Sequence, residues 1–339
     1  MIAIILMATL VAGASQGTLL EPQEERQPTT LEPPPWKATV QFLESLDPAQ
    51  QTRAALELGH PSRLDWSFFP GRRDGIRLDQ LDKDQRAKAM VMIDSILSDD
   101  GELTFDRIQR VEKWVNDRGR KDVGKDAFAV AVYGTPGPGS TWAWRLEGHH
   151  VTLSLAIVDG RVVSLTPCFF GSDPIVVGDG PDKGLQPLRA EDELARALVR
   201  SLDGKQRKLS RLPGKPSENI RSGMSPKIQS VSPAGIAMDQ LDRSQQQKLR
   251  KLIDTYLGRY EPVLVESYRD GTSPDPAVIR FAWTGSLEDG SHLYYQVTGR
   301  NFVIEYANGM GGVTHVHTVW RDRASEFVKL GGSDPDETG

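Results

Sequence analysis

The sequence predicts an α+β fold in which a unit of helices followed by an antiparallel β-meander occurs twice, and the two copies pack as one pseudo-symmetric body. The first observation is a repeat: residues 75–97 and 235–257 are identical at 11 of 23 aligned positions without a gap. A fainter similarity lies in the strands downstream, and a helix-start motif occurs four times along the chain. Self-similarity of this kind indicates that one structural unit is used twice.

Length and composition set the first limits on function. The chain has 339 residues, enough for about two domains, and 41 Lys+Arg against 46 Asp+Glu give a formal net charge of −5. This mild acidity argues against a nucleic-acid-binding protein, because such proteins need a basic surface. The single cysteine, Cys168, excludes intramolecular disulfides and a multi-cysteine zinc site.

The N-terminus predicts export. Residues 1–14 hold a short apolar run that ends in Ala12-Gly13-Ala14, which is typical of a signal peptide cleaved near Ala14. The run is too short to span a bilayer, and we expect no transmembrane helix once it is removed. Residues 15–35 are polar and Pro-rich. We therefore expect a periplasmic or secreted protein.

The helix-start motif is Leu-Asp-x-x-Gln, and its aspartates are Asp47, Asp82, Asp203 and Asp242. The pattern predicts a capping box, in which Asp accepts from the free N–H groups of the first turn and Gln reaches back to the Asp N–H. We interpret these aspartates as caps and not as catalytic groups.

The remaining elements follow from apolar periodicity and turn residues. Helices are predicted over residues 36–46, 47–58, 82–98, 104–118, 190–202, 204–211 and 242–258. Strands are predicted over residues 127–133, 141–147, 149–158, 161–166, 278–284, 292–298, 301–307 and 314–320. In the meanders, residues 142–151 resemble 294–302, and each copy then reaches a hairpin dipeptide, Asp159-Gly160 or Asn308-Gly309.

These elements divide the chain into two halves. The first half covers residues 36–211 and the second covers 231–330, joined by a linker at 212–230 that is rich in Pro, Ser and Lys. Residues 167–187 form a long Gly/Pro-rich connection, which often marks a functional loop. The acidic tail at 331–339 is predicted to be disordered.

Four of the six histidines form two tight groups, His149-His150 and His315-x-His317. Residues two apart in a strand share a face, so His315 and His317 project together. Alternation along the strand predicted at 149–158 places His149 on its apolar face and His150 on the other. The repeat places Glu305 on the matching face of the matching strand. The sequence therefore predicts a metal site of His150, Glu305, His315 and His317 for Zn²⁺, Cu²⁺ or Fe²⁺, and His149 is included among its candidate metal ligands.

Three functional hypotheses follow. In the first, the metal activates water for hydrolysis and Glu305 is a ligand or general base. In the second, the protein binds a saccharide, peptide or small molecule without catalysis, in a groove between the two halves that tryptophans could line. The third is a purely structural module, in which the histidines form ordinary hydrogen bonds. No nucleophile elbow, phosphate loop, dinucleotide fingerprint or His-Glu-x-x-His helix is present to favour another enzyme class.

Other residues have simpler interpretations. Trp142, Trp144, Trp283 and Trp320 recur around the predicted strands and suit aromatic core packing better than a groove. Cys168 lies in an apolar context that predicts a buried, inert thiol, with a Cys–His nucleophile as the alternative.

The chain also resembles a known family, the domain of unknown function 3500 family, from about Trp66 to Phe327. The resemblance rests on Trp142-x-Trp144-Arg145…Gly148-His149-His150, Thr166-Pro167-x-Phe169-Phe170-Gly171 and His315-x-His317-x2-Trp320-Arg321-Asp322. Thr314 departs from the pattern, which has Asn before the first histidine of His-x-His. The resemblance implies a shared unit but no activity, so the role of the histidines rests on their spacing alone.

Overall fold

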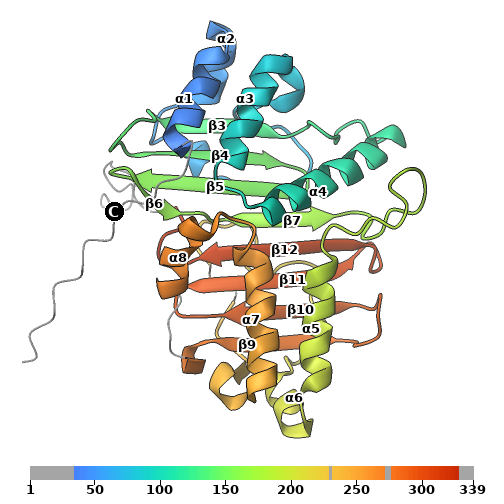
Figure 1. Cartoon of the computed structure of the whole chain (residues 1–339). Coiled ribbons are helices and arrows are strands. Elements are labelled where there is room, and N and C mark those ends of the chain that lie inside the picture. Colours follow the sequence, from blue (N-terminus) through green and yellow to red (C-terminus); the bar gives the residue numbers. More distant parts are fainter. Residues whose placement is uncertain (1–33, 229–230, 272–275, 328–339) are drawn as a thin grey trace, which may run out of the picture.

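The computed structural model describes residues 34–228, 231–271 and 276–327, and it confirms the α+β class (Figure 1). One sheet runs through the whole molecule in the order β1-β3-β4-β5-β7-β12-β11-β10-β9-β8, with β2 beside β3 and β6 beside β5. The helices lie on one face of this sheet (Figure 1). Their bounds are α1 Pro35–Ser45, α2 Pro48–Ala54, α3 Lys83–Asp94, α4 Asp99–Asp117, α5 Arg189–Ser201, α6 Gly204–Ser210, α7 Arg243–Leu257 and α8 Pro262–Gly271, with 3-10 turns at Leu78–Gln80 (η2) and Met238–Gln240 (η3).

The strands are short at the edges of the sheet and longer in its middle. They are β1 Ala55–Leu56, β2 Ile76–Arg77, β3 Ala129–Gly134, β4 Trp142–Gly148, β5 Val151–Val158, β6 Arg161–Ser164, β7 Cys168–Ser172, β8 Ile236–Ala237, β9 Arg280–Gly285, β10 Leu293–Thr298, β11 Phe302–Met310 and β12 His315–Asp322. Antiparallel pairing of β7 with β12, in the register Phe170 opposite Thr318, joins the strands of the two halves. The two halves therefore share one sheet.

All four predicted capping boxes are present. Asp47, Asp82, Asp203 and Asp242 each accept from the first helical turn, and the glutamine three residues later bonds back to the Asp N–H. The boxes are also linked in pairs by their glutamine amides. Gln50 donates to Gln85 at 3.1 Å, and Gln206 donates to Gln245 at 2.9 Å. The motif thus fixes pairs of helices to one another as well as starting each helix.

The cap at Asp82 should contribute measurably to the stability of the protein. Replacing Asp82 with alanine removes the acceptor of two first-turn N–H groups. We expect the free energy of unfolding, measured by urea denaturation, to fall by about 1 kcal/mol. Glu44→Ala, at an exposed site on α1, is the matched control, with an expected change within about 0.5 kcal/mol. Equal effects of the two substitutions would contradict the cap.

Strands and helices that the periodicity missed are short or lie in irregular sequence. β7 falls inside residues 167–187, which were expected to form an aperiodic connection, because its five residues are buried on both faces and show no alternation. α8 and the two-residue strands β1, β2 and β8 were also missed. α5 and α6, assigned from sequence to the first half, lie beside α7 over the second part of the sheet (Figure 1). The predicted tail at 331–339 and the cleavage site near Ala14 lie outside the described residues.

The face of the sheet away from the helices is covered by two irregular segments, residues 57–75 and 212–227. Each segment is held by the side chain of a buried arginine on a strand of the sheet. Arg145 and Arg321 donate to backbone carbonyls of these segments, at Ser62, Arg63 and Asp65 for Arg145 and at Ser222, Gly223 and Ser225 for Arg321. We call residues 57–75 and 212–227 the first and second covering segments.

Asp94 should make the stability of the protein depend on pH. Burial, and then the nearby Glu102, raises the pKa of Asp94 from 3.8 to about 7. Between these pH values the folded state holds a proton that the unfolded state has lost, so stability falls as pH rises from about 4 to about 7. Asp94→Asn should therefore unfold at a higher temperature than the wild type at pH 8, and at an equal temperature near pH 3.5. We expect about 1 kcal/mol, because the half-buried side chain is partly screened by solvent. Parallel melting curves at every pH would contradict this expectation.

Candidate metal centre

His149 and His150 form the turn of a tight hairpin between β4 and β5. Gly148 pairs with Val151, so the two histidines are the whole loop, and His150 has a φ of 65°. The strand predicted from residue 149 in fact begins at Val151, so the predicted alternation of the two histidines across a strand was wrong. The backbone is held from both sides, since the His150 N–H donates to Phe68 and the His150 carbonyl accepts from Gly171. This conformation directs the His150 ring toward β12.

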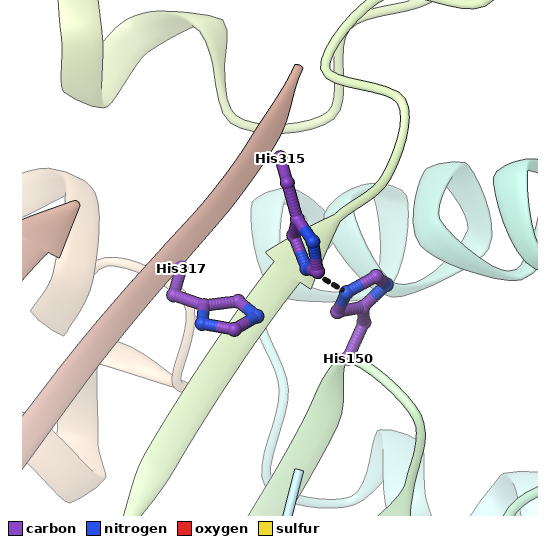
Figure 2. Close-up of side chains that lie close together, drawn as sticks. All are labelled: His150, His315 and His317. Carbon is purple, nitrogen blue, oxygen red and sulfur yellow. Dashed lines mark hydrogen bonds between the residues drawn. The ribbon is translucent and has the colours of Figure 1, made fainter. Parts of the chain in front are cut away.

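His150, His315 and His317 are brought together as the sequence predicted (Figure 2). His315 and His317 project from the same side of β12, the side facing the covering segments, and His150 approaches them from its turn. The Nε2 atoms of His150 and His315 are 2.7 Å apart. The His317 ring centre lies 4.5 Å from that of His315 and 5.6 Å from that of His150. One candidate ligand atom from each of the three residues lies within 4.8 Å of the others.

The Nδ1 atom of each ring faces an oxygen of another side chain. The contacts are His150 with Glu112 Oε1 at 2.8 Å, His317 with Asn219 Oδ1 at 2.7 Å, and His315 with Asp173 Oδ2 at 3.7 Å. The contact of His315 with Asp173 is longer than a hydrogen bond. At His150 and His317, where the contact is a hydrogen bond, the oxygen acceptor favours the tautomer in which Nδ1 carries the proton and Nε2 keeps its lone pair. Metal-ligating histidines use this arrangement.

Burial disfavours the charged form of the three imidazoles. His150 and His317 are almost fully buried, whereas His315 lies at the edge with 13% of its side chain exposed. Loss of hydration lowers the pKa of His150 and His317 well below 6.5, and neighbouring histidines add to the effect. The pKa of His315 is also lowered, again mainly by burial. Neutral imidazole is the form that binds a metal ion.

A glycine makes room for two of these rings. A Cβ atom on Gly171 would lie 2.6 Å from His150 Cδ2 and 2.9 Å from His317 Cδ2. Gly171→Ala should therefore displace both rings and weaken metal binding by roughly 10- to 100-fold, the range seen when ligand orientation is lost. Gly178→Ala is the matched control, since nothing lies within 4 Å of the added carbon. Equal metal affinity for the two variants, measured by competition with a chromogenic chelator, would contradict this packing.

Glu305 is not brought into this cluster, which corrects its predicted role as ligand or general base. Its carboxylate is fully buried and accepts from the backbone N–H groups of Arg221 at 2.6 Å and Ser222 at 2.9 Å, and from the Tyr294 hydroxyl at 2.7 Å. The repeat placed Glu305 on the correct face of the sheet, but its oxygens anchor the second covering segment. Its role in the structure is therefore to hold that segment.

Glu112, Asn219 and Asp173 are the residues of the site that sequence analysis missed. Asn219 and Asp173 lie in irregular segments, so no periodicity points to them. Glu112 had a signal: it follows Phe105 and Ile108 at helical spacing on the buried side of α4. A carboxylate at an apolar position of a helix indicates a buried polar partner.

The tryptophans and Cys168 belong to the core. Trp142, Trp144, Trp283 and Trp320 are each at most 1% exposed and pack in the cluster beneath the helices. They are therefore not available to line a groove for a saccharide or peptide. Cys168 is fully buried, as predicted, and burial raises the pKa of its thiol, which is the behaviour of an inert thiol.

Fold and site together define an α+β protein built on one mixed sheet, with three histidines gathered where β12 meets the β4–β5 turn. The chain belongs to the family described as protein of unknown function (DUF3500), whose family model matches residues 35–329. Neither the curated proteins nor the solved structures contain a match to the chain. Among the described residues, no helix combines the length and the apolar character needed to cross a membrane.

Proposed function

We propose that the protein binds a divalent transition metal ion through the Nε2 atoms of His150, His315 and His317. The observation that carries this proposal is the orientation of the three rings, with each Nδ1 facing an oxygen while the rings converge from two separate elements. A proton shared by His150 and His315 would satisfy only that pair. A metal ion uses all three imidazoles, and Zn²⁺ is the simplest choice, with Cu²⁺ or Fe²⁺ as alternatives.

The charge of Glu112 supports the same proposal. This carboxylate is 1% exposed, and its ion-pair partners among the described residues are His149 and His150, with no Lys or Arg. A buried carboxylate without a permanent cation is costly. A metal ion on the far side of the His150 ring supplies the missing positive charge, in the carboxylate–histidine–metal order common in proteins.

Three protein ligands leave a fourth coordination position, as in catalytic zinc sites. A water molecule at this fourth position would have its pKa lowered by the metal ion. Hydrolysis is therefore the reaction class we propose. The open side is that of His315 and Asp173, whose side chains are 13% and 36% exposed.

Elemental analysis tests the metal site. The purified mature protein is stripped with a chelator, reconstituted with Zn²⁺ and separated from free metal. We expect the wild type to bind one Zn²⁺ per chain more than the His315→Ala/His317→Ala double variant. Equal zinc contents would reject the site. Release of acid from ester, peptide and phosphate-ester substrates, compared between reconstituted and stripped protein, then tests hydrolysis.

We also propose that the fold arose by internal duplication and that its second copy starts at α5. The support is a detailed correspondence. The series strand, 3-10 turn and helix occurs at β2-η2-α3 and at β8-η3-α7, and α1–α2 match α5–α6 through the paired capping boxes. The parallel contact of Ala55 with Val132 has a counterpart in that of Arg211 with Trp283. Two C-terminal fragments test this boundary, one that starts at residue 187 and one that starts at residue 231. Cooperative unfolding of the fragment from residue 187 would agree with a second copy that starts at α5. Cooperative unfolding of the fragment from residue 231 alone would oppose it.

Export is the remaining proposal, supported by the apolar N-terminal run and its small residues. N-terminal sequencing of the exported protein should find a start near residue 15. A mature protein that starts at Met1 would contradict cleavage.

A further inference from the structure

We propose that Glu112, His149 and the Nδ1 atom of His150 form a second metal site, so that the His150 ring bridges two metal ions. This inference rests on the proposed function, because the two sites share His150. It gives a role to His149, which the first site does not use.

The geometry points the ligand atoms at one place. Glu112 Oε1 lies 2.9 Å from His149 Nδ1 and 2.8 Å from His150 Nδ1, and Glu112 Oε2 lies 2.9 Å from His149 Nδ1. The two imidazole rings are tilted by 34° with centres 3.6 Å apart, and both Nδ1 atoms contact the same carboxylate oxygen. One candidate ligand atom from each of the three side chains lies within 4.8 Å of the other two. His150 therefore offers Nε2 to one group of residues and Nδ1 to the other.

The surroundings favour a cation here. Glu112, His149 and His150 are all buried, and no Lys or Arg of the described chain forms an ion pair with the carboxylate. Arg120 is the nearby permanent cation, and after burial and the neighbouring histidines its charge contributes to the lowered pKa of His150 and His315 without pairing with Glu112. Two imidazole nitrogens and one carboxylate oxygen are a donor set that suits Zn²⁺ or Cu²⁺. Tetrahedral zinc with bonds of about 2.0–2.1 Å places its ligand atoms roughly 3.3 Å apart, so these atoms must separate by about 0.5 Å on binding. The first site needs a similar opening between His150 and His315.

The protons balance in a simple way. The metal ion takes the place of the protons at the two Nδ1 atoms. His149 stays neutral by carrying its proton on Nε2, whereas His150, bound through both nitrogens, releases one proton to solvent and becomes imidazolate. The charges of imidazolate and the Glu112 carboxylate then offset one divalent ion. The two metal ions lie about 6 Å apart across the ring, given the bond lengths above.

Copper titration of the metal-stripped full chain tests this inference. We expect the wild type to bind two Cu²⁺ per chain, with an electron paramagnetic resonance signal well below that of two isolated ions, because an imidazolate bridge couples the two spins. Glu112→Gln and, as a second variant, His149→Asn should each bind one Cu²⁺ with the full signal of one ion. His60→Ala, a histidine whose ring bonds to Ser62 and which belongs to neither group of candidate ligands, is the matched control and should bind two.

The possible outcomes separate the two proposals. One Cu²⁺ in the wild type, with binding 10- to 100-fold weaker in Glu112→Gln, would overturn the second site and leave Glu112 as a residue that orients His150. Two Cu²⁺ with the full signal of two ions would overturn the bridge. No bound Cu²⁺ in the wild type would reject the first site as well.

Discussion

Replacing His317 with alanine is expected to remove one metal ion per chain from the reconstituted protein and to leave the fold intact. His317 supplies one of three imidazoles, and its ring is held by Asn219 on one side and by Phe68 and Phe169 on the other. Loss of a ligand should weaken binding by more than the 10- to 100-fold typical of lost orienting contacts, hence by at least about 100-fold. The measurement is metal content by elemental analysis, together with affinity by chelator competition.

Two further variants make this result specific. Asn219→Ala keeps all three imidazoles and removes the oxygen at His317 Nδ1, which also accepts from the Ile220 N–H, so it should weaken binding by roughly 10-fold without abolishing it. His292→Ala, a histidine whose ring contacts the Ser217 carbonyl and which is not a member of the cluster, should bind metal like the wild type. If His317→Ala and His292→Ala bind equally well, the three-histidine site is wrong.

Glu305→Ala is expected to destabilise the protein strongly without reducing the amount of metal that the proposed site binds at saturation. The substitution leaves two backbone N–H groups and the Tyr294 hydroxyl buried without their acceptor. Breaking a buried, fully bonded carboxylate of this kind costs about 3–5 kcal/mol. Urea denaturation measures the loss, and metal content at saturating Zn²⁺ should stay equal to that of the wild type. If the variant is stable but binds no metal, this account is wrong and Glu305 is a metal ligand.

The Glu305→Ala variant distinguishes a structural carboxylate from a catalytic one. Glu147 on β4 is a companion case, since it accepts from the Ser67 N–H and pairs with Arg73 and Arg145 beneath the first covering segment. Glu147 and Glu305 thus each fix one covering segment to the sheet. Those segments carry Phe68 and Asn219, which contact His317. The two segments therefore position side chains around the histidine cluster.

Local signals in the sequence predicted much of the fold. Capping boxes depend on four neighbouring residues, so all four could be identified and all four are present. The side-by-side projection of His315 and His317 follows from strand geometry alone. β7 could not be found in the same way, because a five-residue strand buried on both faces has no period of two, and its place in the sheet depends on distant partners in β5 and β12.

The site shows where prediction from sequence ends. His149 and His150 were placed on a strand because apolar alternation follows them, yet tertiary contacts with Phe68 and Gly171 hold them in a turn. The repeat correctly predicted which face Glu305 occupies but not what its oxygens bind. Asn219 comes from irregular chain 98 residues from its partner His317, and only the folded structure brings the two together.

Anomalous X-ray diffraction at the zinc edge, from crystals of the reconstituted protein, tests the central claim most directly. We predict a peak enclosed by the Nε2 atoms of His150, His315 and His317, with bonds of about 2.0–2.1 Å. A density map with no zinc peak among these three Nε2 atoms, in which the rings bond to one another instead, would contradict the metal centre.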